Sequence, residues 1–194
     1  MDPRIFDQTD HDALLRRLQR DALIEGEEFE LSSGGTSTIY VDVRRVSLQA
    51  LGADLIGRGL WALGCEVESD VGAFGGLTLG ADPLVTSAAL ASRDDRTRPG
   101  IADSIIVRKA TKEHGTGERV EAPAELSRDR PVIAVDDTMT TGNSTLEAVE
   151  QLRADGWTVR HALAVVDREA GARETLAAAD VELHSLYTLD GLVE

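Results

Sequence analysis

Short apolar runs alternate with stretches of helical spacing along most of the chain. Runs rich in Val and Ile predict strands over about 66–74, 103–109, 131–135, 157–168 and 181–189. Apolar residues three or four positions apart predict helices over about 10–26, 47–64, 82–92, 145–154 and 171–179. This alternation predicts an α/β fold, a mostly parallel, doubly wound twisted sheet flanked by helices.

The N-terminal region departs from that alternation. Its helix would be capped by Asp10 and ended by Gly26. Residues 27–48 then alternate in polarity on both sides of a cluster of Ser, Gly and Thr, which predicts a hairpin with a long polar tip. Such a hairpin is either edge structure or a lid over a site. We expect a single domain, with the helix and hairpin hood over about 1–46 and the core over about 47–194.

The stretch Pro131–Ser144, P-V-I-A-V-D-D-T-M-T-T-G-N-S, carries the clearest chemistry. A buried strand leads into two adjacent acids, Asp136 and Asp137, and then into a turn that opens a helix. Unpaired N–H groups at a helix start suit a phosphate, and Gly142 lets the backbone approach it. The carboxylates can accept hydrogen bonds from sugar hydroxyls or from water around a divalent cation. The combination fits a ribose 5-phosphate.

Helix capping offers a plainer interpretation of the same turn. Asn143 or Ser144 would then serve as the N-cap, but this leaves two acids directly after an apolar strand unexplained. A second strand–loop–helix order occurs around Gly75, Gly76 and Gly80, where an anion contact and a tight turn fit equally well. The sequence therefore favours a phosphate site at the first turn and leaves the second open.

Both lysines of the chain lie in one short segment. Arg108, Lys109, Lys112 and His114 fall within seven residues, next to glycines and without apolar anchors. A local positive site on a chain of net charge −15 is what an anionic substrate requires, and the composition predicts a loop that closes over it. The alternative is a solvated hairpin tip.

A third candidate position follows the strand over 157–168. Asp167 and Arg168 would lie at the carboxyl edge of the sheet, where ligands bind in open α/β folds. Arg168 could hold a carboxylate through two parallel hydrogen bonds, or it could simply pair with Asp167.

Composition narrows the class of protein. The 194 residues are 42% hydrophobic and only 4% aromatic, so the core should consist mainly of aliphatic side chains. No apolar run reaches the roughly 18–20 residues of a membrane span, and the start M-D-P-R-I-F-D has no apolar signal region, so we expect a cytoplasmic protein. The single Cys65 excludes an internal disulfide and a cysteine-based metal site, and it should be a small core residue.

The charge balance speaks against nucleic acid and anionic membranes as partners. There are 35 acidic and 20 basic residues, and eighteen of the basic residues are Arg. An acidic, lysine-poor, arginine-tolerant surface resembles those of halophilic archaea and other salt-accumulating cells. The alternative is an acidic enzyme from an ordinary environment. The halophilic interpretation predicts loss of structure at low salt.

Taken together, these segments resemble the type I phosphoribosyltransferases, and among them the orotate-using enzymes. V-I-A-V-D-D-T-M-T-T-G-N-S resembles the family's phosphoribosyl pyrophosphate (PRPP) motif. R-K-A-T-K-E-H-G resembles the mobile catalytic loop of the orotate enzymes, F-E-L-S-S-G-G-T-S-T-I-Y-V-D-V-R their hood, and V-V-D-R-E the strand end whose Arg meets the orotate carboxylate. The similarity covers roughly residues 29–169.

The resemblance implies a role for each matching position. The ribose 5-phosphate of PRPP would be bound by Asp136, Asp137, Thr138, Met139, Thr140, Thr141, Gly142, Asn143 and Ser144. The pyrophosphate would be contacted by Arg108, Lys109, Lys112 and His114. Orotate would be bound by Thr140 and Arg168. The residues expected to be catalytic are Lys109, Lys112, His114 and Asp137.

The resemblance also implies a cofactor and an assembly. Mg²⁺ would be held mainly by PRPP and water, without a cage of protein ligands. The family forms homodimers in which the mobile loop reaches the partner's site. Two positions depart from the best-known pattern: Ser32 replaces a hood Lys, and Thr78-Leu79 replaces Tyr-Lys in the pyrophosphate loop. Both changes remove positive charge, so PRPP binding would depend more on the mobile loop.

Two other functions share part of this pattern. A purine phosphoribosyltransferase would keep the PRPP motif but would not need the Lys/His loop or Arg168. A PRPP-sensing regulator would keep the fold without turnover, but it should carry a DNA-binding module and a basic face, and the sequence shows neither.

Overall fold

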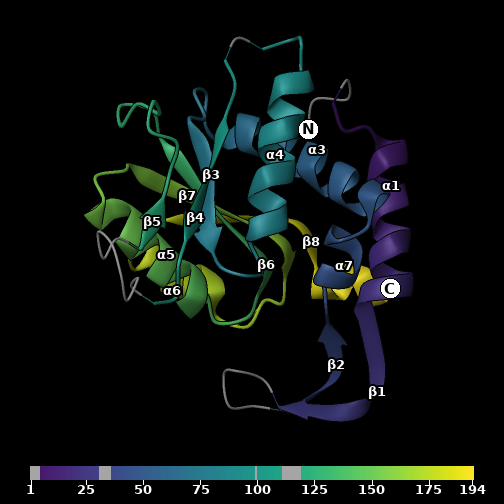
Figure 1. Ribbon diagram of the computed structural model, residues 1–194. Coiled ribbons are helices and arrows are strands. Elements are labelled where there is room, and N and C mark those ends of the chain that lie inside the picture. Colours follow the sequence, from purple (N-terminus) through teal and green to yellow (C-terminus); the bar gives the residue numbers. More distant parts are fainter. Residues whose placement is uncertain (1–4, 31–35, 99, 111–118) are drawn as a thin grey trace.

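The computed structural model describes residues 5–30, 36–98, 100–110 and 119–194, with the backbone alone described at 25, 27–30, 36 and 37. Within these residues the core is a sheet in the order β5–β4–β3–β6–β7–β8 (Figure 1). Its strands are β3 (Ala73–Leu77), β4 (Asp103–Val107), β5 (Val120–Glu121), β6 (Val132–Met139), β7 (Val159–Asp167) and β8 (Glu182–Thr188). All neighbours pair in parallel except β4 and β5, which confirms the predicted fold class.

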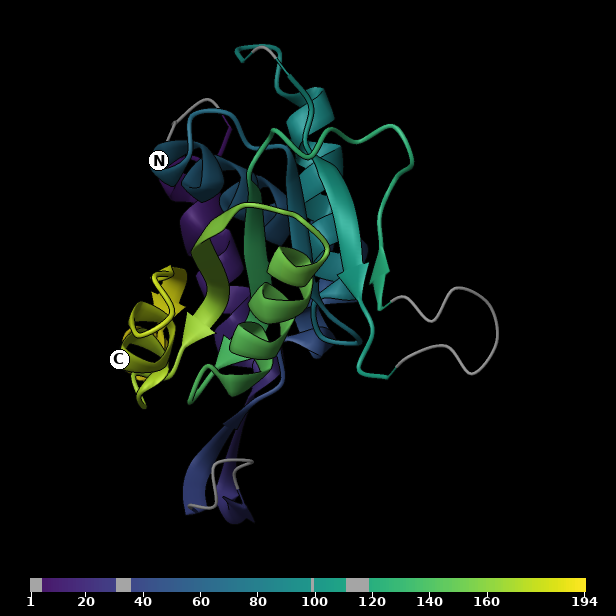
Figure 2. The ribbon, with the colours of Figure 1, turned by 90° about the vertical axis from the view of Figure 1, so that its left-hand side faces the viewer.

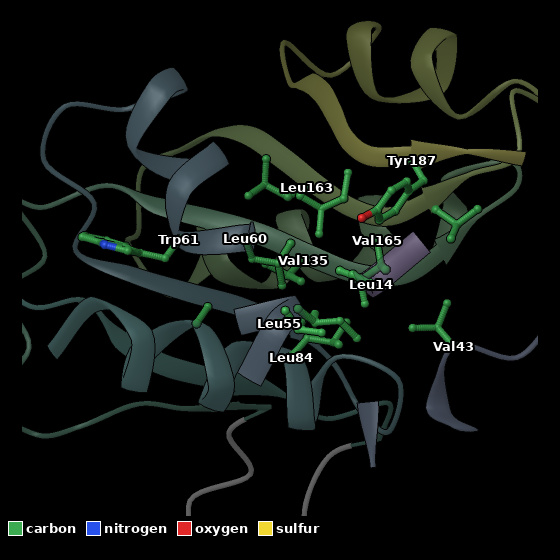
Figure 3. Packing of buried hydrophobic residues seen from close by; sticks show 14 of the residues in the cluster. Leu14, Val43, Leu55, Leu60, Trp61, Leu84, Val135, Leu163, Val165 and Tyr187 are labelled. Carbon is green, nitrogen blue, oxygen red and sulfur yellow. The ribbon is translucent and has the colours of Figure 1, made fainter. Parts of the chain in front are cut away.

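Helices cover both faces of the sheet. They are α1 (Gln8–Arg17), α2 (Arg44–Ser47), α3 (Ala50–Val67), α4 (Asp82–Asp94), α5 (Asn143–Ala154), α6 (Ala172–Ala177) and α7 (Leu189–Val193). Leucines of α1, α3 and α4 pack with Val135 and Leu163 on one face, as Figure 3 shows. Leucines of α5 and α6 pack with Ala134 and Ala164 on the other face. Figure 1 shows the sheet between the two helix layers, and Figure 2 looks from the side of α5. Adjacent residues of one strand point to opposite faces, so the buried strands are apolar throughout.

Close helix packing explains the glycines of α3. A Cβ on Gly57 would lie 2.5 Å from the backbone oxygen of Ser87 on α4, so a side chain there would push the two helices apart. Cys65, further along α3, is partly buried against the same core. The helix predicted over about 47–64 lies three residues too early, and Leu48 and Leu51 at its expected start are exposed. The reason is that residues 44–47 form the separate helix α2, and α3 begins only after its N-cap, Gln49.

The N-terminal helix differs from the prediction at both ends. Asp7 is its N-cap, and Asp10 is the third helical residue, so the two carboxylates form a reciprocal capping box. The helix passes into a π-helical turn, η1 (Leu18–Ala22), and β1 (Leu23–Glu30) follows directly. Gly26 therefore does not end a helix. It lies within β1, where the register with β2 shifts, and its φ is +107°.

The predicted hairpin is confirmed, although it begins earlier than expected. β1 pairs antiparallel with β2 (Thr36–Val41), and the pair projects beyond the carboxyl edge of the main sheet (Figure 1). The expected strand over 66–74 was wrong in its first half, because α3 continues to Val67 and β3 begins only at Ala73. Among the described residues, no helix has both the length and the apolar character needed to span a bilayer.

Candidate active site

The candidate site lies where β3, β6 and β7 end, at the carboxyl edge of the sheet. β6 runs between β3 and β7 and pairs in parallel with both. It is longer than predicted: it continues through both acids to Met139, so Asp136 and Asp137 lie within the strand rather than after it. Pairing of Asp136 with Ala164 and of Met139 with Asp167 on β7 fixes the backbone of the acids. The sheet thus presents these carboxyl groups on a rigid support.

The two carboxyl groups are held by local hydrogen bonds. The backbone N–H of Asp137 donates to Asp136 Oδ1 over 3.0 Å, and the N–H of Thr138 donates to Asp137 Oδ1 over 2.7 Å. Thr145 Oγ1, on the first turn of α5, donates to Asp136 Oδ2 over 3.0 Å. Thr145 was not identified from the sequence, although it lies one helical turn beyond the motif's glycine. Asp136 is therefore tied to α5 as well as to its own strand.

Burial dominates the electrostatics of this pair. It raises the pKa of Asp136, and the neighbouring charge of Asp137 raises it further. Burial also raises the pKa of Asp137, while the Thr138 N–H and the positive charge of Arg44 oppose that shift. Both groups remain partly exposed, so a ligand can reach them. Carboxyl groups with raised pKa values at a strand end are typical of functional sites.

A left-handed glycine forms the turn between β6 and α5. Gly142 has φ +78°, which L side chains rarely adopt, and it is the N-cap of α5 without a side-chain cap. The capping interpretation, with Asn143 or Ser144 in that position, was therefore wrong, because α5 begins at Asn143. The first N–H groups of α5 lack a side-chain cap and point toward the turn. A small hollow lined by Asp136 and residues 138–145 lies here.

The glycine loop after β3 lies against the acids. A Cβ on Gly80 would be 3.1–3.2 Å from the carboxyl group of Asp137. The sequence left this loop open between an anion contact and a tight turn. The structure brings it to the acidic pair, a proximity that no spacing in the sequence could reveal. Leu79, where the resemblance leads us to compare with a Lys, is 74% exposed and offers an anion no charge.

Arg168 joins the end of β7 to the hairpin. Its backbone N–H donates to Met139 O over 2.8 Å, and its Nη2 donates to Ile39 O on β2 over 3.1 Å. Burial lowers the pKa of Arg168, and the nearby Tyr40 partly offsets this. Fully buried Asp167 pairs instead with Arg173, at 3.1 Å between Nη2 and Oδ2. The hairpin and the strand end therefore meet at Arg168.

The positive loop is only partly described. Arg108 and Lys109 are exposed directly after β4, and Arg108 forms an ion pair of 3.5 Å with Glu121. Lys112, His114 and the hood residue Ser32 lie outside the described residues. Arg44 is a further cation that the sequence did not single out. Its charge acts on Asp137, while its Nε donates to Asp42 over 3.0 Å.

A mostly parallel sheet that offers two acids beside an uncapped helix start, under a hairpin hood, has the architecture of a type I phosphoribosyltransferase. The orotate phosphoribosyltransferase of Rhodopirellula baltica is 40% identical over 181 residues, which cover 91% of this chain and 90% of the relative. The crystal structure of Mycobacterium tuberculosis orotate phosphoribosyltransferase with Fe(III) dicitrate has a TM-score of 0.77 and 35% identity, covering 94% of this chain and 98% of that one.

A second crystal structure of the M. tuberculosis enzyme, in complex with PRPP, has a TM-score of 0.73 and 33% identity, covering 95% and 99% of the two chains. No protein-family model matches. These similarities extend over nearly the whole length of both proteins. The chain belongs to the orotate phosphoribosyltransferase family.

Proposed function

We propose that this protein transfers the ribose 5-phosphate of PRPP to orotate, giving orotidine 5′-monophosphate and pyrophosphate in de novo pyrimidine (UMP) biosynthesis. Family membership supports the reaction. The observation that supports the location of this reaction is the pair Asp136 and Asp137 beside the start of α5, where Gly142 is the N-cap and no side chain caps the helix. This one feature offers acceptors for ribose hydroxyls and donors for a phosphate.

Residues 136–144 would bind the ribose 5-phosphate. Backbone N–H groups between Thr140 and Ser144 would donate to the phosphate, and Gly142 allows it to come close. The carboxyl groups of Asp136 and Asp137 would accept from the ribose hydroxyls. Buried Thr138 Oγ1 has no hydrogen-bond partner among the described residues, and a bound ligand would supply one.

Orotate would lie between the end of β7 and the hairpin. The guanidinium of Arg168 would donate to its carboxylate, and Thr140 would contact the ring. Arg168 is already turned toward β2 by its hydrogen bond to Ile39 O, so its position is set before substrate binds. Its lowered pKa reflects burial, and an anion beside it would offset that cost.

In the transfer, the bond from C1 of the ribose to the pyrophosphate oxygen breaks, and a bond from C1 to N1 of orotate forms. The ribose becomes oxocarbenium-like, and the carboxylates of the acidic pair would lie where that positive charge develops. Arg108, Lys109, Lys112 and His114 would stabilise the charge on the leaving pyrophosphate, each well-aimed donor contributing about 3–4 kcal/mol. We propose a homodimer in which this loop serves the partner's site.

Mg²⁺ fits this donor set. Two adjacent carboxyl groups that remain partly exposed suit a cation that keeps several waters and binds substrate phosphates. When bound with PRPP, the ion would neutralise charge on the pyrophosphate. The chain's own part would be to orient the ribose through Asp136 and Asp137, so metal binding without PRPP should be weak.

The acidic, lysine-poor composition supports a further proposal, that the protein is adapted to high salt, as in a halophilic archaeon. Net charge −15 in so small a protein causes self-repulsion that salt screens. A cytoplasmic location, expected from the sequence, stays a prediction.

The test is pyrophosphate release from PRPP and Mg²⁺ in the presence of orotate, adenine, guanine or hypoxanthine, or no base. Of these bases, only orotate should cause pyrophosphate release, and orotidine 5′-monophosphate should be the second product. Release with a purine base instead would establish the purine enzyme. PRPP binding without release on any base would identify a non-catalytic PRPP sensor.

A further inference from the structure

Two histidines and a glutamate come together on neighbouring strands, away from the candidate active site. His161 lies on β7 and faces Glu182 in the register of β8, with His184 two residues further along β8. Residues 161 and 163 share one face of β7, and 182, 184 and 186 share the matching face of β8, because strand side chains alternate. Leu163 and Leu186 of these sets belong to the same core cluster, so all three polar side chains project from one face of the sheet.

The nitrogen and oxygen atoms of this cluster all lie within 4.8 Å of one another. His161 Nδ1 and His184 Nε2 are 3.4 Å apart, and Glu182 Oε2 is 3.8 Å from each of them. Ligands about 2.0–2.1 Å from a tetrahedral Zn²⁺ are separated by about 3.3 Å. The two imidazoles thus already have the separation that a tetrahedral ion requires. The 69% exposed side chain of Glu182 has room to close the remaining few tenths of an ångström.

The surroundings of the cluster suit a bound metal. The histidine side chains are only 17% and 21% exposed, which limits competition by water. Two imidazoles and one carboxylate select Zn²⁺ and similar transition metals over Mg²⁺, which prefers oxygen ligands.

We propose that His161, Glu182 and His184 form a binding site for a divalent transition metal such as Zn²⁺, with water as the fourth ligand. Asp136, the first of the proposed PRPP residues, pairs with Ala164, which is three residues or about 10 Å along β7 from His161, so a metal bound here would not contact that carboxyl group. The bound metal would have a structural effect, because its ligands would connect β8, the edge strand of the sheet, to β7. The site is distinct from the proposed Mg²⁺–PRPP chemistry.

Cobalt spectroscopy tests the proposal directly. Chelator-treated protein in excess Mg²⁺, which saturates oxygen-rich sites, is titrated with Co²⁺ and then with Zn²⁺. We expect one equivalent of Co²⁺ with the visible absorption of a tetrahedral ion, displaced by one equivalent of Zn²⁺. Glu182→Gln and His184→Gln should weaken binding at least about tenfold. Binding that is absent in the wild type, or unchanged in both variants, overturns the proposal.

The matched control is His114→Gln, which also removes one imidazole, and it should bind as the wild type does. Loss of binding in His114→Gln alone would place the metal elsewhere. Glu182→Gln keeps the test valid if His184→Gln fails to fold, since Glu182 is largely exposed. Zn²⁺ should raise the melting temperature of the wild type and not that of Glu182→Gln. Orotate-dependent pyrophosphate release in Mg²⁺ should be unchanged in Glu182→Gln, so failure of the metal site and failure of the proposed function give different results.

Discussion

Asp136 and Asp137 lie next to each other at the end of β6, and burial raises the pKa of both. A raised native pKa means that the folded protein holds these protons more tightly than the unfolded chain does. The stability they contribute is therefore present at low pH and is lost as the pH rises through the native pKa values. At neutral pH the pair reduces stability, as expected of groups kept for function.

Substitution by Asn at either position should separate the cost of the acids to stability from their contribution to turnover. Asp136→Asn and Asp137→Asn should raise the melting temperature at about pH 8. The gain from Asp136→Asn should vanish near pH 4, because burial raises the pKa of Asp136 to about 7 and the wild-type group is protonated there. Turnover should fall about 10²–10³-fold, because the ribose loses charged acceptors in the transition state. Thermal scans at both pH values and steady-state kinetics measure this. Wild-type turnover in Asp137→Asn would remove that residue from the mechanism.

Arg168 is the second residue whose role can be isolated. Arg168→Gln should raise the KM for orotate about 10–100-fold and change the KM for PRPP little, since a charged hydrogen-bond partner of the carboxylate is lost. Arg160→Gln is the control on the same strand: Arg160 is exposed near the other end of β7 and pairs with Glu68. Its KM values should match the wild type. Equal effects on both substrates in Arg168→Gln would contradict an orotate-specific role.

At the scale of elements, the turn between β6 and α5 holds the site together. Gly142 has φ +78°, and a Cβ there would approach Ala172 on α6 to 3.2 Å. Gly171 has φ +99°, but a Cβ there would meet nothing within 4 Å. A substitution at Gly171 would therefore cause backbone strain alone, whereas one at Gly142 would cause backbone strain and a steric contact with α6.

Gly142→Ala should lower the free energy of unfolding more than Gly171→Ala does. Gly171→Ala should cost about 1–2 kcal/mol from backbone conformation alone, and Gly142→Ala that amount plus the displacement of α6. Only Gly142→Ala should also raise the KM for PRPP, because it moves the N–H groups of α5. Urea unfolding and PRPP kinetics of both variants provide the comparison. Equal losses in the free energy of unfolding would show that the contact with α6 does not contribute to the effect of Gly142→Ala.

The same elements show what the sequence could predict. Buried strands and helical spacing gave the order of elements, and the acids before a glycine turn gave the phosphate site, because both signals are local. The start of the first helix was misplaced because two aspartates, Asp7 and Asp10, can each serve as the N-cap. Contacts between distant segments, such as Gly80 with Asp137 or Arg168 with Ile39, depend on tertiary packing and leave no local signal.

For the whole molecule, charge is the dominant feature. The net charge is −15, so the excess negative charges repel one another. Several ion pairs of the protein lie at its surface, as between Arg20 and Asp21 or Arg93 and Asp94. Such exposed pairs stabilise little, whereas screening of the net repulsion is global. The melting temperature should therefore rise between about 0.1 M and about 3 M KCl. A melting temperature that does not change would contradict adaptation to high salt.

The central claim is that PRPP binds at the carboxyl edge of the sheet between β6 and α5. A crystal structure of this protein with PRPP and Mg²⁺ tests it most directly. We predict the 5-phosphate on the N–H groups of residues 140–144 and the ribose hydroxyls on the carboxyl groups of Asp136 and Asp137. PRPP bound elsewhere, with Asp137 and Thr141 facing solvent, would contradict the account.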